Sequence, residues 1–78
     1  MEKLYENENG FIKMNPLNNI EVYKESTRNL DGIYDVSINH VYTLYDNGYI
    51  RNELLGKVYN AGLKTLDERK ICAIEMLK

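Results

Sequence analysis

The sequence contains few of the residues on which small proteins build reactive or metal-binding centres. Its 78 residues include one cysteine, one histidine, one proline and no tryptophan. The single cysteine, Cys72, excludes an intrachain disulfide, and no Cys-x-x-Cys pair or paired histidines with zinc-ligand spacing occur. We therefore expect no metal and no cofactor, and a reducing compartment, with the cytoplasm as the default location.

Long apolar runs and an excess of positive charge are also missing. No stretch stays apolar over the roughly 20 residues that a membrane helix needs, and the first residues lack the apolar core of a signal peptide. Ten Lys and Arg against twelve Asp and Glu give a net charge of −2, which does not favour nucleic acid as a partner. We expect a single small domain, residues 1–78, without a membrane segment.

The residues that could carry catalysis have no spacing that predicts it. His40 would need Cys72 or a serine beside it and a carboxylate such as Asp35 or Asp46 behind it. Glycine-rich phosphate-binding loops do not occur either. We therefore expect that the protein is not an enzyme, that His40 is solvent-facing or hydrogen-bonded, and that Cys72 packs as a small hydrophobe.

The first part of the chain has the pattern of antiparallel β-hairpins. Apolar residues flank an Asn-Gly pair at 9–10 and an Asp-Gly pair at 31–32, and both pairs are typical of hairpin turns. The expected strands are 3–6, 11–14, 20–24 and 33–36. The alternative is a helix over 16–31, with Asn15 as N-cap and Pro16 in the first turn, which would give an all-α four-helix fold.

A short phrase that occurs twice predicts two helix ends. Residues 44–49 and 58–63 each contain an apolar residue and a tyrosine, then two small residues, a glycine and a further apolar residue. A left-handed glycine followed by a hydrophobe is typical of helix C-termini, so we predict helices that end at Gly48 and Gly62. Ser37 is the expected N-cap of the first of them.

The last helix has the clearest start. Thr65 and Glu68 have the spacing of a capping box, in which each side chain satisfies a backbone amide near the other residue. The predicted fold class is therefore α+β, with small antiparallel hairpins within 3–36 followed by three short helices at about 38–47, 53–61 and 66–78.

A long strand is the rival to the helix at 38–47. In that strand Asn47-Gly48 forms a hairpin turn, and one face carries Tyr34, Val36, Ile38, His40, Tyr42 and Leu44. We favour the helix, because the return strand after Gly48 would contain only 49–51 and would have little to pair with.

Tyrosine is the most suggestive surface residue. The chain has seven tyrosines, more than a core of this size can bury, and tyrosine is enriched in protein interfaces. On the last helix, Cys72 and Met76 form a second apolar strip away from the expected core face. The predicted partner-binding residues are Tyr42, Tyr45, Tyr49, Tyr59, Cys72 and Met76.

These features favour a non-catalytic protein-binding module. Small size, a missing active site and composition predict an inhibitor or adaptor of phage or mobile-element type that acts on a host protein; a homodimer through Cys72 and Met76 belongs to the same class. The alternative is a small DNA-binding transcriptional regulator with a degenerate helix-turn-helix at 54–71, although Asp67 and Glu68 place acids at the start of its recognition helix.

Overall fold

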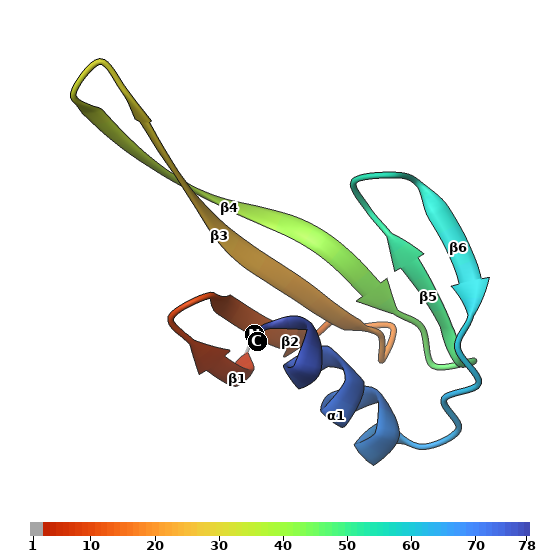
Figure 1. The fold of residues 1–78 in the computed structure, drawn as a ribbon. Helices are drawn as coiled ribbons and strands as arrows, with labels where there is room; N and C mark the ends of the chain where they lie inside the picture. Colours follow the sequence, from red (N-terminus) through yellow and green to blue (C-terminus); the bar gives the residue numbers. More distant parts are fainter. Residues whose placement is uncertain (1–2) are drawn as a thin grey trace.

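The computed structural model describes residues 3–78, which form a six-stranded antiparallel sheet with one helix against it (Figure 1). The elements are β1 (Lys3–Asn7), β2 (Gly10–Met14), β3 (Ile20–Leu30), β4 (Ile33–Leu44), β5 (Tyr49–Asn52), β6 (Lys57–Asn60) and α1 (Leu66–Met76). Each strand pairs with the next one in the chain. Such a sheet needs only short turns between neighbouring strands.

The core lies between one face of the sheet and α1. Its buried members are Ile12, Ile20, Val22, Val41, Leu44, Ile50, Ala73 and Leu77. Ile20 faces Leu44 across the β3–β4 ladder, and Leu44 faces Ile50 on β5, so one row of side chains crosses three strands. The register shifts between Val22 and Tyr23, and this bulge lets two consecutive residues of β4, Val41 and Tyr42, both contact the core.

Hydrogen bonds satisfy backbone groups at both ends of α1, and those at its C-terminal end join it to the first hairpin. The predicted capping box is confirmed, because Thr65 Oγ1 accepts from the Glu68 amide and the Glu68 carboxylate accepts from the Thr65 amide. At the other end, the side-chain amides of Asn7 and Asn9 donate to the Leu77 carbonyl at 3.2 and 2.7 Å. The turn of the first hairpin thus satisfies a carbonyl that the end of the helix leaves open.

The predicted fold class, with three helices, is wrong. Only the last of the three forms, as α1, whereas 38–47 lies in β4 and the turn after it, and 53–61 forms a turn and β6. The all-α alternative is wrong too, because most of 16–31 belongs to β3. The first hairpin and the turn at Asp31-Gly32 are confirmed, but the second hairpin is much longer than predicted.

Residues 38–44 form a strand rather than a helix because β4 lies beside β3 from one end to the other. β3 pairs with β4 from Leu30 opposite Ile33 to Ile20 opposite Leu44. The return strand β5 is indeed short, but it pairs with β4 on one side and with β6 on the other. The prediction failed because β6, from a segment assigned to a helix, supplies the pairing that β5 would otherwise lack.

The segment 53–61 begins like a helix and then turns back. Asn52 Oδ1 accepts from the amides of Leu54 and Leu55, both at 3.0 Å, as an N-cap does. Gly56 then adopts a φ of +70°, which reverses the chain after one turn and leads into β6. The two glycines of the repeated phrase, Gly48 and Gly62, also have positive φ, but each follows a strand rather than a helix.

Candidate functional site

The sheet face opposite α1 carries a row of three stacked rings. Phe11, Tyr23 and His40 are neighbours on β2, β3 and β4, and the ring centroids of both adjacent pairs are 4.9 Å apart, with interplanar angles of 12° and 20°. The ammonium groups of Lys3 and Lys13 lie 4.5 and 4.9 Å from the Phe11 and Tyr23 centroids. Because the flat faces of these rings cover one another, the row does not offer the open aromatic platform on which nucleobases stack.

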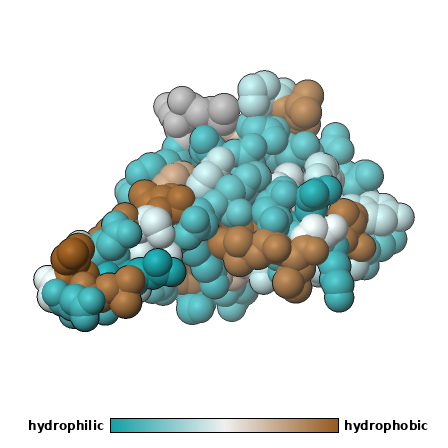
Figure 2. Space-filling model, turned by 90° about the horizontal axis from the view of Figure 1, so that it is seen from above, coloured by the Kyte–Doolittle hydropathy of each residue, from teal (hydrophilic) through white to brown (hydrophobic). Residues whose placement is uncertain are grey.

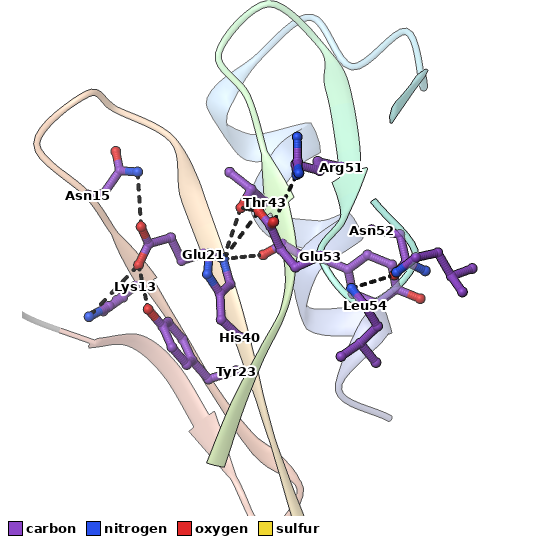
Figure 3. Close-up of polar contacts among 12 residues, drawn as sticks. Lys13, Asn15, Glu21, Tyr23, His40, Thr43, Arg51, Asn52, Glu53 and Leu54 are labelled. Atoms are coloured by element: carbon purple, nitrogen blue, oxygen red, sulfur yellow. Dashed lines mark hydrogen bonds and ion pairs between the residues drawn. The ribbon is translucent and has the colours of Figure 1, made fainter. Parts of the chain in front are cut away.

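Beside this row, His40, Thr43 and Glu53 form a hydrogen-bond chain (Figure 3). His40 Nε2 lies 3.1 Å from the carbonyl oxygen of Tyr42, which can only accept, so Nε2 carries a proton. Thr43 Oγ1 accepts from Nε2 at 2.9 Å and donates to Glu53 Oε2 at 2.6 Å. A hydroxyl nucleophile would have to donate its proton to the histidine. In this hydrogen-bond chain the histidine donates to the hydroxyl, which is the opposite direction.

Glu53 fastens the start of the β5–β6 turn to β4. Its amide donates to the Val41 carbonyl at 2.9 Å, and its carboxylate also accepts from Arg51 Nε at 2.9 Å. Burial raises the pKa of Glu53, but the hydrogen bonds from Thr43 and Arg51 and the charges of His40 and Arg51 together outweigh burial and hold that pKa below its ordinary value. The carboxylate therefore stays ionised at neutral pH, in a structural position.

Glu21 forms a second polar cluster on the same face (Figure 3). Its carboxylate accepts from the Tyr23 hydroxyl at 2.8 Å and from the Asn15 amide at 3.1 Å, and Lys13 Nζ lies 3.8 Å away. Burial and then the Glu21 carboxylate raise the pKa of Tyr23 to about 12, because both disfavour the phenolate. This cluster fixes the orientation of the central ring of the row.

Titration of the tyrosines should reveal this contact. One phenol should ionise near pH 12, and Tyr23→Phe should remove that step from the absorbance titration, whereas Glu21→Gln should move it to lower pH. A raised pKa means that the stability contributed by the protonated phenol is complete below pH 10 and is lost as the pH rises through about 12. A late step that persists in Tyr23→Phe would contradict the assignment.

Four of the six predicted partner-binding residues lie on the helix side of the sheet. Tyr42, Cys72 and Met76 are partly buried and pack against the core. Tyr59, on β6, is half exposed, and its pKa is raised by burial and then by the neighbouring Cys72 and Tyr42. Burial also raises the pKa of the Cys72 thiol, which reduces its reactivity as a nucleophile.

The other two predicted residues lie apart from this group. Tyr49 pairs with Asn60, the neighbour of Tyr59 on β6, so Tyr49 and Tyr59 point to opposite faces of the sheet. Tyr45 is partly buried in the turn between β4 and β5. The structure therefore does not gather the six residues into one surface.

The helix-turn-helix expected at 54–71 is wrong as a structure. Its first helix is replaced by the β5–β6 turn and β6, and only its second part enters α1. Arg69, which a DNA-binding helix would present to phosphates, is only 9% exposed, and its Nη1 donates to the Asn18 carbonyl at 3.0 Å. This arginine ties α1 to the β2–β3 loop instead.

A different surface lies on the distal half of the β3–β4 hairpin, residues 25–39, which we call the arm. Figure 1 shows β3 and β4 extending together beyond the rest of the sheet. β2 ends opposite Lys24 and β5 pairs with β4 only from Tyr42 onward, so every residue of the arm is exposed. The arm carries five large apolar side chains that are 45–69% exposed: Leu30, Ile33, Tyr34, Val36 and Ile38.

The two faces of the arm differ in polarity. Tyr34, Val36 and Ile38, which we call the apolar row, alternate along β4 with polar residues and so share one face. On the other face, the hydroxyls of Ser26 and Ser37 are 2.9 Å apart and hydrogen-bonded. Figure 2 shows hydrophobic residues, in brown, at the projecting end of the molecule.

Sequence reasoning missed the apolar row as a binding surface, although its signal is visible. The row belongs to the rival strand described above, whose alternation correctly places Tyr34, Val36, Ile38 and His40 on one face. The bulge moves Tyr42 and Leu44 to the opposite face. What the alternation could not show is that the rest of the described chain, residues 3–78, leaves the row exposed.

Comparison of the chain with protein-family models, with curated proteins and with solved structures gives no significant match. Within residues 3–78, no group of three or more His, Cys, Asp or Glu side chains is placed to hold a metal ion. The same part of the chain has no helix of the length and apolarity needed to cross a membrane. The class that the fold and its surfaces define is a small antiparallel sheet with one helix and a projecting hairpin arm.

Proposed function

We propose that this protein is a non-catalytic binding module that docks on another protein through its arm. The observation that carries the proposal is a ribbon of two strands with a row of large apolar side chains that stay exposed among residues 3–78. Two-stranded hairpins are only marginally stable alone, and clustered exposed apolar residues mark interaction sites. A protein partner that covers the row would supply the packing that the arm lacks.

The charge of the arm favours a protein over nucleic acid. β-Ribbons of some DNA-binding proteins enter a groove, but they need positive charge to do so. Residues 25–39 contain one basic residue, Arg28, against three acidic residues, Glu25, Asp31 and Asp35. The arm would therefore be repelled by phosphates, whereas the apolar row suits the apolar surface of a protein.

The role of a small cytoplasmic inhibitor or adaptor of phage or mobile-element type belongs to this proposal as its narrower form. Its support is the size and composition of the chain. In this form the sheet and α1 serve as a scaffold that holds the arm. The polar clusters around Glu53 and Glu21, on the sheet face opposite α1, stiffen the scaffold.

Substitution of the apolar row tests the proposal. In affinity capture from a lysate of the source cells, the double variant Tyr34→Ser with Ile38→Ser should retain at least tenfold less of the partner protein than the unsubstituted chain. A matched control, Thr27→Ser with Asn29→Ser, changes the residues of β3 that lie opposite Val36 and Tyr34 and should retain the partner in full. Because the changed side chains are exposed, the free energy of unfolding of both variants should stay within about 0.5 kcal/mol of the original.

Two results would contradict the proposal. One is equal capture of the same partner by the Tyr34→Ser, Ile38→Ser variant. The other is an unsubstituted chain that retains nucleic acid in a salt-sensitive manner and no protein, because phosphate contacts weaken steeply with salt whereas apolar contacts do not.

A further inference from the structure

Among the strands of residues 3–78, none pairs with the outer edge of β4 along the arm. β5 pairs with β4 only at Tyr42, Thr43 and Leu44, so the backbone groups that point away from β3 between Ile33 and His40 have no strand beside them (Figure 1). An open edge of this kind is a template for a further strand.

Natural proteins protect such edges, and this edge has little protection. The usual devices are lysines, prolines, bulges or short length. Between Ile33 and Asn39 there is no proline and no lysine, the only charged residue is Asp35, and the bulge lies at the base of the arm, opposite Val22 and Tyr23. The edge of β4 is thus left open to pairing.

The sequence of this edge is complementary to itself. In an antiparallel pair of two β4 edges centred on Val36, Val36 lies opposite Val36 of the second copy, and Tyr34 lies opposite Ile38 of the second copy, in both directions. Aromatic and β-branched residues are favourable cross-strand pairs. On the other face Asp35 lies opposite Ser37, so no like charges meet. Every contact between two different residues thus occurs twice, once in each direction between the copies, as a two-fold interface requires.

Neighbouring registers are less favourable. Centring the pair on Asp35 would set two aspartates opposite each other. Centring it on Ser37 would place Tyr34 opposite His40, so Tyr34 would no longer lie opposite a member of the apolar row. A shift by one residue would bring the apolar row of one copy against the polar face of the other, because side chains alternate between faces.

We propose that the occupant of this edge is a second copy of the chain, paired antiparallel along β4 about Val36. This inference rests on the proposed function, because it takes the arm as the binding element and adds a partner for its edge. The paired arms form one four-stranded ribbon in which the two apolar rows lie side by side. Dimerisation thereby widens the apolar face that the proposed module presents to its partner protein.

Sedimentation of the purified full chain tests the association. The apparent mass should rise with concentration from the 9.2 kDa of one chain towards twice that value. Val36→Lys would set two ammonium groups opposite each other and should keep the chain at the monomer mass. Thr27→Lys is the matched control, because Thr27 lies opposite Val36 on β3 and on the same face, away from the proposed edge. This variant should associate like the original.

Cysteine cross-linking tests the register. In a Cys72→Ala background, Val36→Cys should form a disulfide dimer under mild oxidation at least tenfold faster than Thr27→Cys, because directly opposed residues are within disulfide reach. Asp35→Cys and Ser37→Cys should each cross-link slowly alone, and their equimolar mixture should give the mixed dimer.

The outcomes separate this inference from the proposed function. A monomer mass at all concentrations, or a Val36→Cys chain that cross-links no faster than Thr27→Cys, would overturn the pairing, even where capture of a partner still depends on the apolar row. Association abolished by Val36→Lys would support the pairing, even where capture does not depend on the row.

Discussion

Replacing Gly10 with alanine should destabilise the protein by at least about 3 kcal/mol, at the upper end of what single substitutions cost. A Cβ atom at position 10 would lie 2.0 Å from the Tyr23 carbonyl oxygen and 3.0 Å from Lys24 Cα, both backbone atoms of β3. The φ of Gly10 is +154°, outside the range that side-chain-bearing residues prefer. β2 and β3 would have to separate at the place where Phe11 stacks on Tyr23.

The loss should be visible in urea denaturation and in the melting temperature. A domain of this length has a total stability of roughly 4–12 kcal/mol, so Gly10→Ala removes a large share of it. Gly62→Ala is the matched control, because Gly62 has a φ of +69° with nothing near its would-be Cβ, and backbone strain alone should cost about 1–2 kcal/mol. Equal losses for the two variants would show that the close approach of β3 does not matter.

The second large effect is expected from the pair Ile20→Ala and Ile33→Ala. The two substitutions are chemically identical, but Ile20 is fully buried under α1 and Ile33 is 69% exposed on the arm. Ile20→Ala should cost about 2–5 kcal/mol, through lost burial and the cavity left behind, and lower the melting temperature by at least about 8 °C. Ile33→Ala should change stability by no more than about 0.5 kcal/mol.

The two variants should be compared at low protein concentration, where any association through the arm is minimal. The measured difference then reports on the stability of the single chain. A loss from Ile33→Ala as large as that from Ile20→Ala would contradict the exposed position of Ile33 on the arm. The comparison thus measures whether Ile33, an exposed apolar residue of the arm, contributes to the stability of the fold.

The sequence predicted the elements whose causes are local. Thr65 and Glu68 begin a helix because their side chains satisfy amides three residues apart in the chain. Asp31-Gly32 forms a tight turn because both residues accept positive φ, at 53° and 82°. These signals involve atoms within a few residues of one another, so they hold whatever the rest of the chain does.

The candidate site was less predictable than the elements. The sequence favoured a binding surface of tyrosines, and the structure places those residues partly in the core and on both faces of the sheet. The apolar row could be read as one face of a strand. The exposure of the row could not be predicted from the sequence, because exposure depends on how far β2 and β5 extend along their neighbours.

By itself, the sequence determined where the chain reverses and where its last helix begins, since glycine conformation and capping act over a few residues. Only the tertiary structure decided between helix and strand for 38–47 and 53–61, because their patterns fit both periods and pairing with distant segments settled the choice. It also decided that the hairpin of β3 and β4 outgrows the sheet and leaves its apolar row and edge uncovered. That uncovered arm is the feature from which a function can be proposed.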